Sequence, residues 1–502
     1  MQGIRTALSV SVASRCWAAL ANLIAVPVYV HLMGLEAYGV VGFFASIQVV
    51  MSFMDLGLPA TLTRELAVRG ASPSNAGADR NLVWTFELVY VGITLLVGMV
   101  LLIALPPLAT YWIDPVVLSD TELGHALLIA GVALACQWPS NLYSAGLTGL
   151  HRQTSLAAST SLLAVVRVAL TVAFLRHEPT LAAFFWAQLL AGLMQSLVTR
   201  WQLLKALPAA GRGAVAQWSV LLSTRSFAGG MTAISVTTIA VTQLDKLVLI
   251  HLLPLPEFGI YVIATTVATG MYVLVSPMFL LLYPLFSRLW AQGSWDELKQ
   301  LYELSGMSMA AMVMPLTAVI SVFAAQVLEV WTGNALVAQQ GAWVLTFLTL
   351  GFALSGLLNI SHALQLAAGW TSLSVYINLG AIFFLVPAVW WGAKSYGGVG
   401  GAAAWFVLNV VYVVLVPWLT HRRLLPDAAA PWYARALLLP AAASGLTVAL
   451  LWMLHQPLAS RVQTGGQLFF YWIVVSAVTV VSMRPLREKV HEIVRKVVHE
   501  KS

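Results

Sequence analysis

Charged side chains are the first thing that this chain lacks. Asp, Glu, Lys and Arg together make up only 9% of its 502 residues, whereas a soluble globular chain carries roughly 25%. Hydrophobic residues make up 60%, and no polar stretch is long enough to form a soluble domain. The composition therefore excludes a soluble globule and predicts a core made of lipid contact and helix–helix packing.

Cysteines and cofactor-binding motifs are scarce as well. The two cysteines, Cys16 and Cys136, both lie in apolar stretches, so they predict neither a disulfide framework nor a metal site. The sequence has no phosphate-cradling glycine loop, no cluster of metal ligands, and no serine or cysteine nucleophile with its base. We therefore expect no metal, no cofactor and no catalytic residue, and we expect the protein not to be an enzyme.

Long apolar segments dominate what is present. Fourteen of them are long enough to span a bilayer, which takes about 20 residues. They lie near residues 9–31, 38–60, 82–107, 123–147, 154–175, 180–204, 226–252, 258–284, 305–330, 340–367, 370–392, 399–420, 432–455 and 466–483. Prolines at 139 and 277 fall within two of these segments and predict kinks there. The predicted fold is an all-α polytopic membrane protein with about 14 transmembrane helices.

Basic residues give the orientation. The net charge is +7, which in a soluble protein would raise the question of nucleic acid. In a membrane protein the basic residues gather in cytoplasmic loops, so we expect no nucleic-acid partner. With the N-terminus inside, the outside segments hold only Arg176, Lys394 and Arg461, and most other Lys and Arg residues fall inside. This asymmetry predicts an even number of spans with both termini in the cytoplasm.

The sequence also repeats itself. Residues 31–39 (HLMGLEAYG) resemble residues 251–259 (HLLPLPEFG), and both join one predicted span to the next on the outside face. Residues 149–156 match residues 366–373 more weakly, at nearly the same offset. A repeat of this length predicts two similar halves, each starting from the cytoplasmic side.

The predicted domain organisation follows from that repeat. We expect two six-helix lobes, residues 1–212 and 213–424, as parallel repeats about an axis along the membrane normal. Such repeats are typical of transporters whose site lies between the halves. Residues 425–483 add two spans without a partner, and residues 484–502 form a basic tail. The tail is either an amphipathic helix on the cytoplasmic membrane surface or a solvated extension.

Two segments carry a resemblance to a known family. Leu32–Arg64 contains a Gly-x-x-x-Tyr-Gly turn at Gly34–Gly39 and the run Asp55-Leu56-Gly57-Leu58. This segment resembles the start of the Wzx-type polysaccharide flippases of the multidrug/oligosaccharidyl-lipid/polysaccharide exporter superfamily. Gln243–Thr265 is similar to the seventh-helix region of that family.

The resemblance implies a function and its partners. Such a flippase moves an undecaprenyl-diphosphate-linked oligosaccharide to the periplasmic leaflet, by alternating access of two lobes around a cationic cavity. This places the protein in the bacterial inner membrane and in the synthesis of a surface polysaccharide, either lipopolysaccharide or exopolysaccharide. It also implies contact with membrane lipids, with the polysaccharide polymerase and with the chain-length machinery.

Cations inside the predicted spans are the candidate substrate ligands. An ionisable group at bilayer depth costs several kcal/mol, so it usually faces a cavity or a partner. Guanidinium groups bind phosphate oxygens bidentately, which suits a diphosphate. The candidates are Arg15, Arg167, Lys246 and Arg225. Arg15 and Lys246 are expected to converge from the two lobes; alternatively Lys246 forms a structural ion pair, and Arg225 snorkels to the interface.

Acidic residues at depth have two alternative interpretations. Asp55, Glu87 and Asp245 are either proton carriers in a coupled cycle or partners that neutralise nearby cations. Asp245 adjoins Lys246, but neighbouring helical residues point about 100° apart and need not pair. Arg64 is expected in a cytoplasmic loop, where it forms part of a gate or simply follows the charge rule.

Several rival functions remain open at this stage. One is a cation-coupled multidrug antiporter of the same superfamily, which would carry an acidic pocket in its first lobe. Another is a lipid II flippase. A membrane-embedded glycosyltransferase or polymerase would need catalytic residues in a sizeable outside loop, and the outside loops here are short. Cations outnumber anions inside the spans, which favours an anionic substrate.

Overall fold

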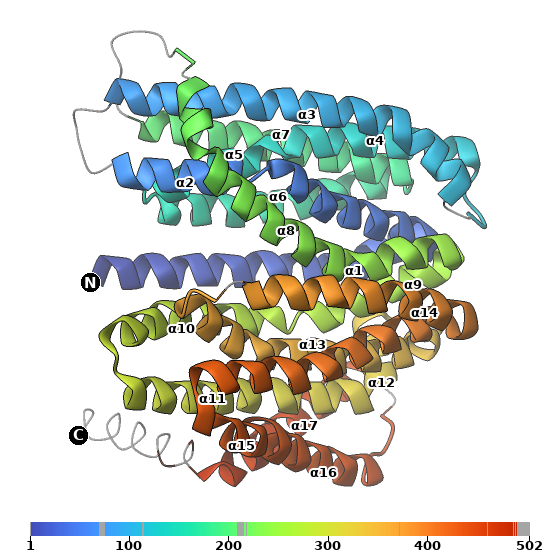
Figure 1. The fold of residues 1–502 in the computed structure, drawn as a ribbon. Coiled ribbons are helices and arrows are strands. Elements are labelled where there is room, and N and C mark those ends of the chain that lie inside the picture. The colour runs from blue at the N-terminus through green and yellow to red at the C-terminus, as the bar shows by residue number, and fades with distance from the viewer. Residues whose placement is uncertain are drawn as a thin grey trace, which may run out of the picture. The chain divides into compact units, whose positions relative to one another are not determined.

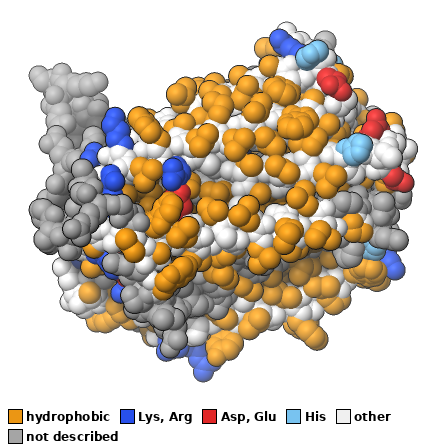
Figure 2. Space-filling model, turned by 90° about the horizontal axis from the view of Figure 1, so that it is seen from above, with side chains coloured by type: hydrophobic (Ala, Val, Ile, Leu, Met, Phe, Trp, Pro, Cys, Tyr) orange, Lys and Arg blue, Asp and Glu red, His pale blue; other side chains and the backbone are white. Residues whose placement is uncertain are grey.

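The computed structural model of the chain describes residues 2–69, 76–112, 115–207, 215–216, 218–370, 372–458, 460–484, 486 and 488. These residues are helical almost throughout and contain no strand. Eleven helices among them are long and apolar enough to cross a membrane, and hydrophobic side chains cover most of the face drawn in Figure 2. The predicted all-α polytopic membrane protein is therefore confirmed.

The chain divides into two compact units, Met1–Gly259 and Ile260–Ser502, each of which is described by itself. The helices of the first unit are named in Figure 1. They are α1 (Gln2–Met51), η1 (Ser52–Asp55), α2 (Leu58–Arg69), α3 (Ala76–Trp112), α4 (Asp120–Gln137), α5 (Pro139–Gly149), α6 (Gln153–His177), α7 (Leu181–Ala206) and α8 (Trp218–Leu252). Helix α9 (Leu255–Thr269) begins in this unit and continues into the second.

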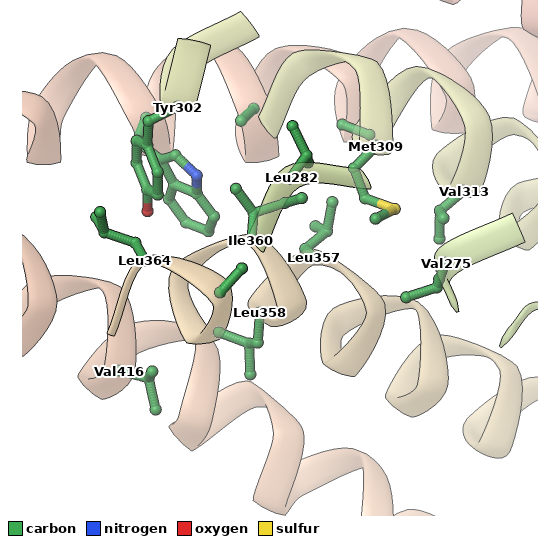
Figure 3. Packing of buried hydrophobic residues seen from close by; sticks show 14 of the residues in the cluster. Val275, Leu282, Tyr302, Met309, Val313, Leu357, Leu358, Ile360, Leu364 and Val416 are labelled. Atoms are coloured by element: carbon green, nitrogen blue, oxygen red, sulfur yellow. The ribbon is translucent and has the colours of Figure 1, made fainter. Parts of the chain in front are cut away.

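The second unit is built around a large hydrophobic core. Its helices are α10 (Tyr272–Gln292), α11 (Trp295–Val322), α12 (Ala324–Thr332), α13 (Ala335–Ala367), α14 (Ser372–Leu424), η3 (Pro426–Ala428), α15 (Ala429–Trp432), the π-helical turn η4 (Tyr433–Leu438), α16 (Leu439–Met453) and α17 (Arg461–Ser482). Side chains from α10, α11, α13 and α14, among them Leu282, Tyr302, Ile360 and Val416, meet in this core (Figure 3).

Glycines make the sharp turns between spans that run on as one helix. In α1 the chain turns at Gly34, whose φ is +84°, between the first and second predicted spans. In α14 it turns at Tyr396 and Gly397, where the glycine φ is +58°. Both glycines adopt the left-handed region, which a side chain would disfavour. The predicted span boundaries at these two turns agree with the structure.

Other predicted spans are interrupted in their interior. The second one, 38–60, is not a continuous helix: it breaks between η1 and α2, with Leu56 and Gly57 at φ +47° and +67°. The fourth breaks at Pro139, as its proline predicts. The eighth breaks at Gly270–Met271 between α9 and α10, whereas Pro277 lies inside α10. The break thus lies at the glycine and not at the second proline, and the kink expected at Pro277 stays a prediction.

The two copies of the repeated sequence touch each other within the first unit. A Cβ added at Gly39 would lie 2.6 Å from the backbone oxygen of Leu255. One added at Gly259 would meet the backbone oxygen of Leu35 in the same way. Only glycine permits so close a helix approach, and the contact is reciprocal between equivalent positions. The lobe boundaries at 212 and 424 stay a prediction, and most of the predicted tail, 484–502, lies outside the described residues.

Candidate functional site: a carboxylate cluster and a separate cation in the first unit

Helix α3 carries a line of buried polar side chains. Glu87, Tyr90 and Thr94 are spaced three and four residues apart, so they lie on one face of the helix. All three are buried, although the rest of α3 is strongly apolar. Thr94 satisfies itself by donating to the backbone oxygen of Tyr90 at 2.8 Å. Glu87 and Tyr90 instead form hydrogen bonds with side chains of other helices, and each belongs to a separate hydrogen-bonded group.

The first group is built around Asp55, at the break between η1 and α2. The Tyr90 hydroxyl donates to Asp55 Oδ1, and the Trp138 indole nitrogen Nε1 donates to the same oxygen at 2.6 Å. The Tyr90 and Trp138 rings lie 5.4 Å apart. Trp138 stands where α4 gives way to α5. Two interrupted spans are thus joined through one carboxylate.

The local sequence explains why the chain breaks there. Leu56 and Gly57 take left-handed backbone conformations, which glycine adopts freely and leucine does not. The Gly57 carbonyl then accepts from the Thr61 backbone N–H at 3.0 Å and so starts α2. On the other side, Pro139 stands at the start of α5, where its missing N–H costs nothing. Each break orients a polar side chain toward α3.

The second group is an ion pair around Glu87. Glu87 Oε1 accepts from the Tyr143 hydroxyl of α5 at 2.7 Å and from Nε of Arg200 of α7 at 2.6 Å. The Arg200 side chain is 40% exposed while that of Glu87 is 9% exposed, so the arginine reaches inward from a wet surface. Glu87 therefore has the neutralising partner that one of the two sequence interpretations expected.

Asp55 differs from Glu87 in that respect. Among the residues that the structure describes, no Lys, Arg or His lies within ion-pair distance of Asp55. Its two partners are neutral hydrogen-bond donors. A carboxylate held only by neutral donors can gain or lose a proton without breaking an ion pair. This arrangement suits a proton-carrying group, and the assignment of that role to Asp55 stays a prediction.

A cation stands apart from the carboxylates, on α6. Arg167 Nη2 donates to Gln195 Oε1 of α7 at 2.7 Å. In the described part of the chain no carboxylate pairs with this arginine. One turn further along α6, Thr171 accepts from the Gln188 amide of α7 at 3.1 Å. The Gln195 partner of the Arg167 guanidinium is thus a neutral amide, which uses only one of its five N–H donors.

Helix α1 runs alongside the first turns of α6. The Ser14 hydroxyl donates to the backbone oxygen of Ala157 at 2.9 Å, and Ser161 donates to Ser14 at 2.8 Å. Arg15 follows Ser14 on α1, but its side chain lies outside the described ones. Residue 157 precedes Arg167 by ten residues, which is about 15 Å along a helix. The expected convergence of Arg15 and Lys246 from the two lobes stays a prediction.

The other predicted site residues are placed as follows. Lys246 Nζ lies 3.6 Å from Asp245 Oδ1 and donates to the Thr242 backbone oxygen at 3.2 Å, so the two neighbours on α8 do contact each other. Arg64, which was expected in a loop, lies instead on helix α2, where it is exposed. Arg225 lies on α8, and its side chain is not among those described. Of the predicted cations, Arg167 has the best-defined surroundings.

Sequence reasoning missed several members of these groups. Tyr90 and Tyr143 were not singled out, and Arg200 was counted only among the basic residues of the cytoplasmic side. The spacing of Glu87 and Tyr90 on an otherwise apolar helix was the signal that could have found one of them. Glu36 was also missed: it is buried just after the turn at Gly34 and accepts from the backbone N–H groups of residues 116–118 at 2.6–3.3 Å.

Metal binding finds no support in the described residues. Among them, no three His, Cys, Asp or Glu side chains are grouped so that they could hold a metal ion. The carboxylates of Asp55 and Glu87 instead accept from hydroxyl, indole and guanidinium donors. What the geometry offers is proton exchange at a carboxylate and anion binding at a guanidinium.

The fold has known relatives among transporters. The structure of a MATE-family multidrug resistance transporter of the MOP superfamily in an inward-facing conformation matches with a TM-score of 0.65, at 14% identity over 81% of this chain and 94% of that chain. The lipid II flippase MurJ, in an inward closed conformation, matches with a TM-score of 0.60, at 10% identity over 92% and 97%. A mutant of the Vibrio cholerae MATE transporter VcmN matches with a TM-score of 0.57, at 18% identity over 86% and 99%.

Sequence comparison identifies the family. None of the curated proteins matches the chain. The family model described as polysaccharide biosynthesis protein matches residues 6–290, which is more than half of the chain and includes the whole carboxylate cluster and Arg167. The predicted resemblance to a polysaccharide family is confirmed, and the chain belongs to the polysaccharide biosynthesis protein family.

Proposed function

We propose that this protein is a flippase for an undecaprenyl-diphosphate-linked oligosaccharide of surface polysaccharide synthesis, in the bacterial inner membrane with both termini cytoplasmic. Membership of the polysaccharide biosynthesis family supports a substrate of this class. The single observation that carries the proposal is Arg167, a guanidinium at membrane depth with an amide partner and no carboxylate within ion-pair distance in the described residues. Such a cation is costly unless an anion visits it.

Side chains of α6 and α7 suit both the diphosphate and the sugars of this substrate. Arg167 would bind a diphosphate oxygen through two parallel N–H donors, while Gln195 holds the guanidinium in place. Neighbouring hydroxyl and amide groups, such as Ser161, Thr171 and Gln188, match sugar hydroxyls in hydrogen-bonding capacity. Arg15, on the neighbouring α1, would add a second cation nearer the cytoplasmic end. No covalent step is needed, so the protein acts as a transporter and not as an enzyme.

The carboxylate cluster would couple transport to an ion gradient. Asp55 joins the breaks of two spans through Tyr90 and Trp138. Protonation would convert this carboxylate from a pure acceptor into a group with its own donor, which changes the contacts that hold the two breaks together. The two breaks would then move relative to each other, which is the kind of bistable element that alternating access requires.

The test is the pool of lipid-linked sugars in the native host. Deleting the gene should raise the undecaprenyl-linked repeat unit measured by mass spectrometry, and the wild-type gene should restore it. Arg167→Gln should fail to restore it, and Arg167→Lys should do so only partly, because lysine keeps the charge without the bidentate geometry. The control is Arg176→Gln, an exposed arginine at the end of the same helix, which should behave as wild type.

A cation-coupled multidrug antiporter is the second candidate. The carboxylates of Asp55 and Glu87 are the observation that favours it, because anionic groups inside the first unit would attract a cationic drug. Glu87, however, is already paired with Arg200. If gene deletion left the lipid pool and surface glycan unchanged but raised sensitivity to cationic drugs, the flippase proposal would be wrong and the antiporter would replace it. A specific build-up of lipid II would instead indicate a lipid II flippase.

A further inference from the structure

We infer that a cleft beside the two appended spans binds the phosphate head group of an anionic glycerophospholipid. Two adjoining cavities of about 380 and 390 Å³ share the side chains of Met307 and Arg435. They lie between α11, the π-helical turn η4 and the end of α17. This inference is independent of the proposed function, because it concerns a lipid that stays bound beside the transporter.

The packing of α11 explains why a cleft opens there. At one end α11 meets the appended helices through a compact apolar cluster that includes Phe323, Val448 and Val475. At the other end α11 meets a smaller apolar cluster of Met307, Ala311 and Met483, where α17 finishes. The appended α16 is preceded by the π-helical turn η4, which carries Arg435. A π turn holds an extra residue and often accompanies functional sites.

The lining combines two guanidinium groups with an apolar wall. The second cavity is lined on its polar side by Arg435, Ser482 and Arg484, and on its apolar side by Met307, Leu439 and Met483. Arg435 Nη1 lies 3.6 Å from Glu303 Oε2, and its side chain is 55% exposed. That single contact leaves the other N–H donors of this arginine available.

Arg484 has fewer contacts than Arg435, and its positive charge favours an anionic ligand. It is exposed, and among the described residues no carboxylate lies within ion-pair distance of it. Glu297 and Glu303 line only the first cavity. The second cavity is therefore cationic, and its two guanidinium groups match a phosphate monoanion.

The position of the cleft identifies the source of that phosphate. Ser482 is the last residue of α17 and Arg484 follows it closely, so the cleft opens at the end of this membrane span, where head groups lie. Leu439 lies deeper, within the apolar segment Ala429–Met453. On the face predicted to be cytoplasmic, anionic lipids are attracted by basic side chains. A soluble phosphate would leave the methionine and leucine wall unused, whereas a glycerophospholipid covers it with the start of its acyl chains.

The experiment measures lipid binding to the full-length protein in neutral detergent by native mass spectrometry. Short-chain phosphatidylglycerol should bind more tightly than phosphatidylcholine. Arg435→Gln and Arg484→Gln should each lower the affinity for phosphatidylglycerol by about fivefold, as expected for one basic residue near an anionic surface. Arg→Lys at the same positions should retain the preference. Arg461→Gln is the matched control, because this exposed arginine sits at the other end of α17 and donates to the Gly333 backbone oxygen.

Four outcomes would overturn the inference. Equal affinity for the two lipids would show that no head-group site exists. An equal loss in the Arg461→Gln control would indicate general surface charge. Loss of the preference on deleting residues 489–502 would place the lipid on the tail and not in the cleft. Glycerol 1-phosphate should compete poorly, and strong competition would point to a soluble phosphate compound instead.

Discussion

The second predicted span of each half is broken in its interior, and the two breaks differ in chemistry. In the first unit the break near Asp55 is held by a carboxylate, a tyrosine hydroxyl and an indole N–H. In the second unit the break at Gly270–Met271 is neutral: Thr317 donates to the sulfur of Met271 at 3.5 Å, and the Tyr272 hydroxyl bonds Ser355 at 2.9 Å. The same interruption of a span is therefore polar and protonatable in one unit and close to apolar in the other.

We expect this difference to give the two breaks separate tasks. A break held by a carboxylate responds to protonation, whereas one held by a thioether and neutral hydroxyls does not. The break in the second unit lies in the hydrophobic core formed by α10, α11 and α13. We therefore expect substitutions at Asp55 to alter transport and substitutions at Met271 to alter packing only.

The largest effect is expected for Asp55→Ala. Removing the carboxylate leaves the buried Tyr90 hydroxyl and Trp138 indole without their acceptor, at about 1–3 kcal/mol for each group. Unfolding in mixed micelles should therefore begin at clearly lower denaturant, and the lipid-linked repeat unit should accumulate as in the deletion strain. Asp55→Asn keeps an acceptor oxygen and should be nearly as stable as wild type, yet inactive. An active Asp55→Asn protein would show that the charge is not used.

The Glu87–Arg200 pair should give the next effect. Arg200→Gln leaves Glu87 with only Tyr143, and truncating one partner of a buried pair costs about 3–5 kcal/mol. We expect roughly half of that, because the arginine side chain is 40% exposed and solvent screens the pair. The double variant Glu87→Gln with Arg200→Gln should recover most of the loss in the same unfolding measurement. No recovery would mean that the two side chains do not act as a pair.

The sequence predicted much of the fold and little of the partner choice within it. Long apolar segments, the glycine turn at Gly34 and the break at Pro139 follow from local chemistry, and the structure agrees with them. The break beside Gly57 was hidden, because the residues around it remain apolar enough to continue a span. Pairing also depends on which helices become neighbours: Arg200 lies 113 residues from Glu87, and hydropathy and spacing carry no information on contacts over that distance.

The smallest effect is expected for Met271→Leu, which completes the comparison of the two breaks. The substitution nearly conserves volume and removes only a weak sulfur acceptor, so it should cost less than about 1.5 kcal/mol. Thr317 keeps its hydrogen bond to the Val313 backbone oxygen at 2.7 Å, and no buried donor is left unpaired. The lipid pool in cells that carry this variant should equal that of wild type. If it instead rose as in Asp55→Asn, both breaks would take part in the transport cycle, and the division of tasks between them would be wrong.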